Sequence, residues 1–326
     1  MRILFWGDTD GNNGPFNINK GIVSNLTEAF LTVKRRRKYR DFMAACWNLL
    51  RADVLVVANV SRKGSFLGAA AKCLGKQLVF IMHGCNRYEA EQNHITYSDS
   101  RQEWEDSLLK NADLLLPVSK RFMYWVHDYY PQYIQKTKYL YNGIDDRIFN
   151  STFIGQKKVG SVAVYGGLTP LKNNLPVLQA VDALQGRVSL TVYGTANADG
   201  TIEGNYTWKF GKLPHDQFLQ ELADTQVFVL NSVFEPFSIS VVEALACGCS
   251  VLVSEAAGVT GLLALEETDI IHDPMDVEEI RVKMEYLLDH PNYERLYSQL
   301  DIEEWTFEKM VQRLERHCRE LAEKKY

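Results

Sequence analysis

The sequence predicts an α/β protein made of two Rossmann-like domains, and three observations lead to this expectation. Short runs that are apolar throughout alternate with segments of helical periodicity, which is typical of a parallel sheet covered by helices on both faces. The alternation restarts in the second half of the chain. The chain has 326 residues, more than one ordinary hydrophobic core accommodates.

Four apolar strands, each followed by helical or charged segments, predict the first domain. The strands are expected at 2–6, 53–60, 77–84 and 113–119. Helices are expected within 19–31, at 68–75, after 84 and at 120–130. Because ligands of open α/β sheets bind at the carboxyl ends of the strands, residues just after each strand are the candidates for a site.

The second domain repeats this organisation. Strands are expected at 160–167, 187–194, 207–213, 227–231 and 250–254, with helices within 173–184 and 215–223. The polar run 150–158 is the best linker, and the tail from Asp276 reads as an outer helical cover. We therefore expect a first domain over 1–152, a second over 153–305, and a C-terminal helix over about 306–326 that rejoins the first.

Composition limits the classes of function. A net charge of -5 provides no global basic field, so we expect no nucleic-acid partner. Six scattered cysteines lack metal or CxxC spacing, which favours reduced thiols in a cytoplasmic protein. No apolar run approaches the roughly 20 residues of a membrane-spanning helix, so attachment to the inner face of the cell membrane is the closest membrane contact that we expect.

Two carboxylates lie in an otherwise apolar stretch, "VFVLNSVFEPFSISVVEALACGCSVLVS" at 227–254. Glu235 precedes a helix that we expect to begin at Ser238 or Ile239 and to stop at Gly248, and Glu243 lies about one turn inside it. Eight helical steps span about 12 Å. The free amides of a helix N-terminus favour a phosphate, so the segment could hold a nucleotide sugar at the sugar, the diphosphate and the ribose.

The alternative is that Glu235 is a solvated loop residue and that Glu243 pairs with a neighbouring lysine or arginine. Apolar strands and the small residues "ALACG" favour burial instead, and an unpaired buried carboxylate is costly.

The segment "FEPFSISVVEALACGCSVLVS" resembles the E-x7-E segment of the retaining GT-B glycosyltransferases of family 4, also called glycosyl transferases group 1. Further segments match in the same order: "PVSKRF", "YNGIDDRIF", "VYGGLTPLKNN", "LTVYG", "KFGKLPHDQF", "DIIHDPMDVEEI" and "WTFEKM". The resemblance implies a GT-B fold, with two Rossmann-like domains facing across a cleft and C-terminal helices packing back toward the first domain.

The resemblance also implies residue roles. Glu235, Lys172 and His83 are the expected catalytic residues, with Lys172 neutralising charge on the departing diphosphate and His83 near the transferred sugar. The donor is expected to lie on Gly166, Gly167, Phe237, Ser238, Ile239 and Glu243, and against Gly11 and Gly14 in the glycine-rich stretch 8–21. The resemblance implies a UDP- or GDP-linked sugar as the donor substrate. Family members act without a metal, so we expect neither a metal nor a cofactor.

Three positions depart from the family. Gly167 stands where an arginine is usual, which removes a cation expected to face the diphosphate; Arg62 and Lys63 are candidate substitutes. Ser238 replaces a common glycine and is expected to cap the helix, and Ser250 replaces a common proline. These changes leave two readings open, an active hexosyltransferase-type enzyme and a catalytically silent partner subunit.

A basic run over 34–40 is followed by Phe42, Met43 and Trp47. A basic stretch beside an apolar helix face can rest on anionic lipid. We therefore expect residues 34–47 to attach the protein peripherally to an anionic membrane surface. The alternative is a solvated helix whose apolar face is core. Lipid contact would suit a lipid-diphosphate-linked acceptor. We therefore expect transfer to a glycan or lipid-linked acceptor in capsule or lipopolysaccharide biosynthesis.

Overall fold

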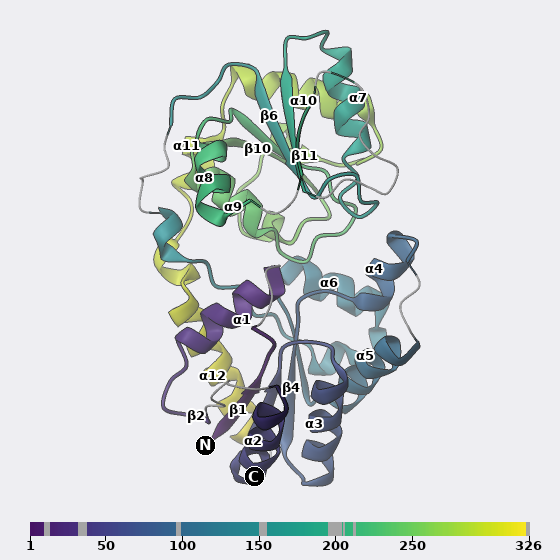
Figure 1. Cartoon of the computed structure of the whole chain (residues 1–326), viewed down its shortest axis with the longest axis vertical. Coiled ribbons are helices and arrows are strands. Elements are labelled where there is room, and N and C mark those ends of the chain that lie inside the picture. Colours follow the sequence, from purple (N-terminus) through teal and green to yellow (C-terminus); the bar gives the residue numbers. More distant parts are fainter. Residues whose placement is uncertain are drawn as a thin grey trace. The chain divides into compact units, whose positions relative to one another are not determined.

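The computed structural model describes residues 1–9, 14–31, 38–95, 99–149, 155–194, 204, 206–210 and 213–323 (Figure 1). The chain divides into two compact units. Unit 1 comprises residues 1–91, 95–145 and 303–326, and unit 2 comprises 92–94 and 146–302. Each unit contains its own parallel sheet, as the alternating pattern predicts.

Unit 1 has a five-stranded sheet in the order β2–β1–β3–β4–β5, with every pair parallel. The strands are β1 (Ile3–Trp6), β2 (Phe30–Leu31), β3 (Val54–Val57), β4 (Gln77–Met82) and β5 (Leu114–Pro117). The helices are α1 (Gly14–Ser24), α2 (Lys38–Arg51), α3 (Arg62–Cys73), α4 (Asn86–Gln92), α5 (Asp99–Asn111), α6 (Lys120–Tyr129) and α12 (Phe307–Glu323), with short 3-10 turns η1 (Pro131–Lys136) and η5 (Ile302–Trp305).

The last helix, α12, returns to unit 1 as expected and packs beside α1 (Figure 1). The ring of Phe307 at its start lies over Gly21 of α1 and Gly143, where a Cβ on either glycine would meet it at 2.2 Å and 2.5 Å. Glycine at both positions therefore allows the close approach of the returning chain.

Unit 2 has a six-stranded parallel sheet in the order β11–β10–β9–β6–β7–β8. The strands are β6 (Ser161–Tyr165), β7 (Ser189–Gly194), β8 (Tyr206–Phe210), β9 (Val227–Leu230), β10 (Ser250–Ser254) and β11 (Ile270–Ile271). The helices are α7 (Leu175–Ala183), α8 (His215–Ala223), α9 (Ile239–Ala246), α10 (Val277–Asp289) and α11 (Tyr293–Tyr297), with 3-10 turns η2 (Asp146–Phe149), η3 (Gly258–Gly261) and η4 (Glu267–Asp269).

The core of unit 2 explains the continuous apolar runs of its strands. Valines of β6, β7 and β9 pack against α7 and against Ile280, Met284 and Leu287 of α10. Helices α8, α9 and α11 gather on the other face of the sheet (Figure 1). Strands buried on both faces need apolar side chains at every position, so alternation is absent.

The expected helix within 19–31 is wrong in its second half. Helix α1 ends at Ser24, and Phe30 and Leu31 form the edge strand β2 beside β1. In the described residues, no helix combines the length and the apolar character needed to cross a membrane.

Candidate active site

The carboxyl ends of parallel strands meet at one edge of a sheet, and the predicted site residues of unit 2 lie at that edge. The turn after β6 carries Gly166, Gly167 and Lys172, and the loop after β9 carries Glu235. Helix α9 follows that loop, so the second carboxylate, Glu243, comes from the adjoining helix.

The turn after β6 depends on two glycines. Gly166 has a φ of 99° and Gly167 a φ of 63°, a region that glycine adopts readily and an arginine at 167 would occupy only with strain. The N–H groups of both glycines donate to the carbonyl of Tyr193, at 2.8 Å and 2.9 Å. These two amides are therefore already engaged, and the glycines shape the turn.

Lys172 and Glu235 form an ion pair between the Nζ and Oε2 atoms, which joins the two strand-end loops. The side chains are only 26% and 17% exposed, so solvent screens this pair less than a surface pair. The two residues that the sequence assigned to the diphosphate and the sugar are thus in direct contact. In a nucleotide sugar those two groups are joined through one anomeric oxygen, so neighbouring positions of the two residues are compatible with a substrate of this class.

The backbone holds both residues in place. The N–H of Val233 donates to the carbonyl of Leu171 at 3.0 Å, and the N–H of Gly258 donates to the carbonyl of Glu235 at 2.8 Å. These main-chain bonds hold the backbone of the two loops that carry the ion pair.

The start of α9 differs from the expected cap. Helix α9 begins at Ile239 and its C-terminal end carries Gly248 at φ 77°, as predicted. Ser238 precedes it with φ 83° and ψ 68°, in the left-handed region, and its side chain makes no capping bond. The expectation that Ser238 caps the helix is therefore wrong, because the left-handed backbone turns the hydroxyl away from the amides that a capping serine reaches from extended backbone.

The loop from β9 to α9 concentrates buried polar atoms without partners in the described structure: Asn231 Oδ1, Ser232 Oγ and Ser238 Oγ. Buried polar atoms are normally satisfied, and exceptions call for a water, an ion or a functional role. Their gathering beside Glu235 makes this loop a candidate for binding a water molecule or a ligand. Phe237, in the same loop, is also buried.

Glu243 pairs with His215 rather than with a lysine or arginine. His215 Nε2 lies 2.7 Å from Glu243 Oε1, and the carboxylate side chain is only 12% exposed. His215 is the first residue of α8, and the sequence reading did not single it out. It lies 28 residues before its partner, so only the packing of α8 on α9 brings the two together.

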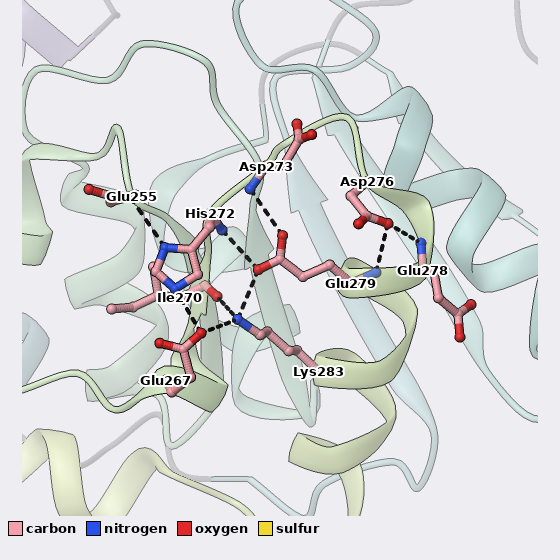
Figure 2. A network of polar contacts seen from close by, with 9 residues as sticks. All are labelled: Glu255, Glu267, Ile270, His272, Asp273, Asp276, Glu278, Glu279 and Lys283. Carbon is pink, nitrogen blue, oxygen red and sulfur yellow. Dashed lines mark hydrogen bonds and ion pairs between the residues drawn. The ribbon is translucent and has the colours of Figure 1, made fainter.

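A polar network braces the same edge of the sheet at β10, β11 and α10 (Figure 2). His272 lies between Glu255, at 3.2 Å, and Glu267, at 2.8 Å. Lys283 donates to Glu267, to Glu279 and to the carbonyl of Ile270. Hydrogen bonds to the two glutamates that flank it raise the pKa of His272.

The strand ends of unit 1 form a second polar cluster around Asn19, which is fully buried. Its Nδ2 donates to the carbonyl of Asp8 at 3.0 Å and to Asn59 Oδ1 at 2.5 Å. Its Oδ1 faces His83 Nε2 at 3.3 Å, so the histidine carries its proton on Nε2. Burial lowers the pKa of His83 to about 4, which keeps the ring neutral near pH 7.

Asn19 and Asn59 were missed by the sequence reading, although each lies within or beside a predicted segment. The glycine-rich stretch is shorter than expected, because α1 begins at Gly14. A Cβ at Gly14 would meet nothing within 4 Å, so no close contact there requires glycine. Gly11 lies outside the described residues. The candidate cations Arg62 and Lys63 open α3, where Lys63 lies over the ring of Phe42.

The stretch Asp8-Thr9-Asp10 has the Asp-x-Asp spacing found in metal-dependent transferases, so the expected metal independence rests on the family resemblance alone. Asp8 follows β1, and its N–H donates to Asn59 Oδ1 at 2.7 Å; Asp10 lies outside the described residues. Among the residues that are described, no cluster of three or more potential metal ligands occurs.

The comparison with known families bears on unit 2. Residues 154–300 match the model of the family described as glycosyl transferases group 1. This part of the chain is therefore similar to that family, over less than half of the whole sequence. The group 1 motifs that the resemblance rests on in this half, from "VYGGLTPLKNN" to "DIIHDPMDVEEI", all fall inside the matched range. No curated protein matches the sequence at significant similarity.

Solved structures match the fold of nearly the whole chain. HepE of Anabaena in complex with UDP matches with a TM-score of 0.71 and 14% identity, over 98% of this chain and 100% of HepE. The sucrose-phosphate synthase of Thermosynechococcus elongatus matches with a TM-score of 0.70 and 13% identity, over 98% and 99%. A glycosyltransferase of Rickettsia africae matches with a TM-score of 0.68 and 11% identity, over 98% of each chain. The chain therefore has the GT-B fold, as expected.

Proposed function

We propose that the protein is a retaining glycosyltransferase that moves a sugar from a nucleotide-sugar donor to a glycan or lipid-linked acceptor. The observation that carries this proposal is the contact of Lys172 with Glu235 at the strand-end edge of a group 1 unit. The similar structures of HepE include complexes with UDP and with UDP-glucose, which supports a UDP-linked donor.

In the proposed reaction, the acceptor hydroxyl oxygen bonds the anomeric carbon on the face from which the diphosphate departs. The bond between that carbon and the diphosphate oxygen breaks, and the acceptor proton passes to the departing oxygen. Lys172 stabilises the negative charge that grows there. Glu235 accepts hydrogen bonds from the sugar and positions it, and need not act as a nucleophile.

Glu243 and the start of α9 complete the donor site in this proposal. The N–H groups at the start of an α-helix lack intrahelical acceptors and favour an anion, so Ile239 and its neighbours suit the diphosphate. Glu243, a turn further on, accepts from the ribose hydroxyls. Because Gly166 and Gly167 use their amides on Tyr193, they contribute a close backbone surface, and Lys172 with α9 supplies the favourable charge.

Substitution of Glu235 tests the assignment. Glu235→Gln preserves shape while removing the negative charge, and Glu235→Ala removes the side chain. We expect both to abolish sugar transfer from UDP- or GDP-sugars while circular dichroism remains that of the wild type. Glu28→Ala, at an exposed position of unit 1, is the matched control and should keep full activity. Near-normal turnover by Glu235→Ala would refute the assignment.

A silent partner subunit is the second candidate, favoured by Gly167 in place of the usual arginine. Donor hydrolysis measured across common UDP- and GDP-sugars separates the two candidates. Turnover of any donor that depends on Lys172 supports the enzyme. Inactivity toward all of them, together with tight binding of a protein partner, supports the silent subunit.

We further propose that α2 rests on an anionic membrane surface. Four apolar residues with spacings of four, four and three residues lie on one exposed face of this helix: Tyr39, Met43, Trp47 and Leu50. Trp47 is 66% exposed. Arg40 and Arg51 are also exposed and border the stripe.

Both sequence-based readings of this segment find support at different residues. The ring of Phe42 packs against Trp6 and Phe66, at 6.1 Å and 5.7 Å between centroids, so it belongs to the interior side. Met43 and Trp47 face outward. Residues 34–37 of the basic run lie outside the described residues. Only their positive charge, which the sequence gives, supports the membrane proposal.

Flotation with phosphatidylglycerol vesicles tests the membrane proposal. We expect the wild type to float with these vesicles and not with phosphatidylcholine vesicles, and the double substitution Met43→Ser with Trp47→Ser to abolish flotation. Val282→Ser, at an exposed apolar position of α10, is the control and should float as the wild type does. Failure of the wild type to float at any salt concentration would exclude α2 as an anchor.

A further inference from the structure

The contact between His215 and Glu243 has no place in the reaction described above, yet it fixes the carboxylate assigned to the ribose. His215 Nε2 lies 2.7 Å from Glu243 Oε1. The imidazole is 51% exposed and the carboxylate 12% exposed, so the histidine stands on the outer side of the pair. The contact is made at Oε1, so Oε2 is available to accept from another donor.

Helix α8, which carries the histidine, is held by buried side chains. Pro214 precedes α8 with φ -52° and ψ 139°, so the entry to the helix is extended and restrained by the proline ring. Phe218, Leu219 and Leu222 of α8 are buried, which fixes the helix that carries the histidine. The imidazole therefore presents its nitrogen from a fixed backbone.

A glutamate side chain has three rotatable bonds, and holding one rotamer before a ligand arrives lowers the entropy lost on binding. A hydrogen bond from a fixed imidazole does this for Glu243. On this basis we infer that His215 is a positioning residue for ribose recognition, holding Glu243 Oε1 so that Oε2 accepts from the ribose hydroxyls. This inference rests on the proposed function, because it takes the ribose of a nucleotide donor as the ligand.

The inference makes a specific prediction about ligands that lack ribose hydroxyls. Binding of UDP and of 2′,3′-dideoxy-UDP, and of GDP and 2′,3′-dideoxy-GDP, is measured by calorimetry on the full chain. His215→Ala is expected to weaken binding of the ribonucleotide about tenfold, the scale of one charge-assisted hydrogen bond, and to leave the dideoxy analogue nearly unchanged. The double variant with Glu243→Ala should lose no more than Glu243→Ala alone.

Two amide variants provide a geometric control. Gln places its side-chain N–H where Nε2 of the imidazole lies, and Asn places it nearer Nδ1. Since the contact is made by Nε2, His215→Gln should retain most of the discrimination between ribose and dideoxyribose, and His215→Asn should lose it as His215→Ala does. His290 is an exposed histidine of unit 2 that lies far from His215 in the sequence. His290→Ala should change the binding of neither the ribonucleotide nor the dideoxy analogue.

The outcomes separate this inference from the proposed function. Failure of the wild type to bind any of the four ligands would overturn the proposed function. Wild-type preference for the ribonucleotide, combined with equal weakening of both ligands by His215→Ala, would overturn only the role of His215. Tighter ribonucleotide binding by His215→Ala would also overturn it, because the histidine would then compete with the ribose.

Discussion

Replacing Ser238 with glycine should make unit 2 more stable, although most substitutions in a buried loop destabilise a protein. Ser238 is buried, has φ 83° and ψ 68°, and its hydroxyl has no partner in the described structure. An L-residue in the left-handed region costs roughly 1–2 kcal/mol. A buried hydroxyl without a partner costs about 1–3 kcal/mol. The added freedom of glycine in the unfolded chain opposes these gains by roughly 0.5–1 kcal/mol.

The lower ends of the two gains, less the cost of glycine, leave a net gain of about 1–1.5 kcal/mol in the free energy of unfolding. For a domain of this size, 1 kcal/mol corresponds to roughly 2–4 °C in the melting temperature. Differential scanning calorimetry of the full chain, which resolves transitions of separate units, measures the shift. Ser240→Gly is the matched control, because Ser240 lies inside α9 where the backbone is right-handed and glycine brings no relief. A melting temperature of Ser238→Gly at or below the wild-type value would refute the reasoning.

Two further substitutions test the strand-end edge of unit 2. Gly166→Ala should lower turnover by about 100-fold, because a Cβ there would lie 2.4 Å from Lys172 Cγ and displace the lysine from its position. Steady-state kinetics measures this change, and a near-normal rate would contradict the prediction. His272→Gln should destabilise the protein at pH 5.5 and much less at pH 8.5. The pKa of His272 is raised in the folded protein by Glu255 and Glu267, so its contribution is full below the unfolded value near 6.5 and is lost as pH rises through the folded value. Urea denaturation at both pH values measures the difference, and an equal loss at both would contradict the assignment.

Local pattern was sufficient for much of unit 2. The apolar run 227–231, the loop with Glu235 and the stop at Gly248 specified β9 and α9 closely, because each signal lies within a few residues of the element that it predicts. The carboxyl-end rule then placed Lys172 and Glu235 at one edge of the sheet without knowledge of the strand order.

The remaining features depend on which strands and helices become neighbours. Asn19, Asn59 and His83 meet because β1, β3 and β4 are adjacent, and periodicity does not give that order. His215 meets Glu243 through the packing of α8 on α9. Ser238 was mispredicted for a different reason. A serine before a helix predicts a cap, and only the backbone angles of the structure reveal that this serine makes none.

The ion pair of Lys172 with Glu235 has a consequence for selectivity. If Lys172 and Glu235 bind the donor as proposed, the ammonium and the carboxylate neutralise each other before it arrives, so the pair offers little net attraction to a lone anion or to a free sugar. Inorganic phosphate would have to bind the lysine and leave the glutamate without its partner. A monosaccharide would have to bind the glutamate and leave the lysine without its partner. A nucleotide sugar would present a diphosphate to the lysine and hydroxyl groups to the glutamate at the same time, so the proposed enzyme would bind the whole donor in preference to phosphate or to a free sugar.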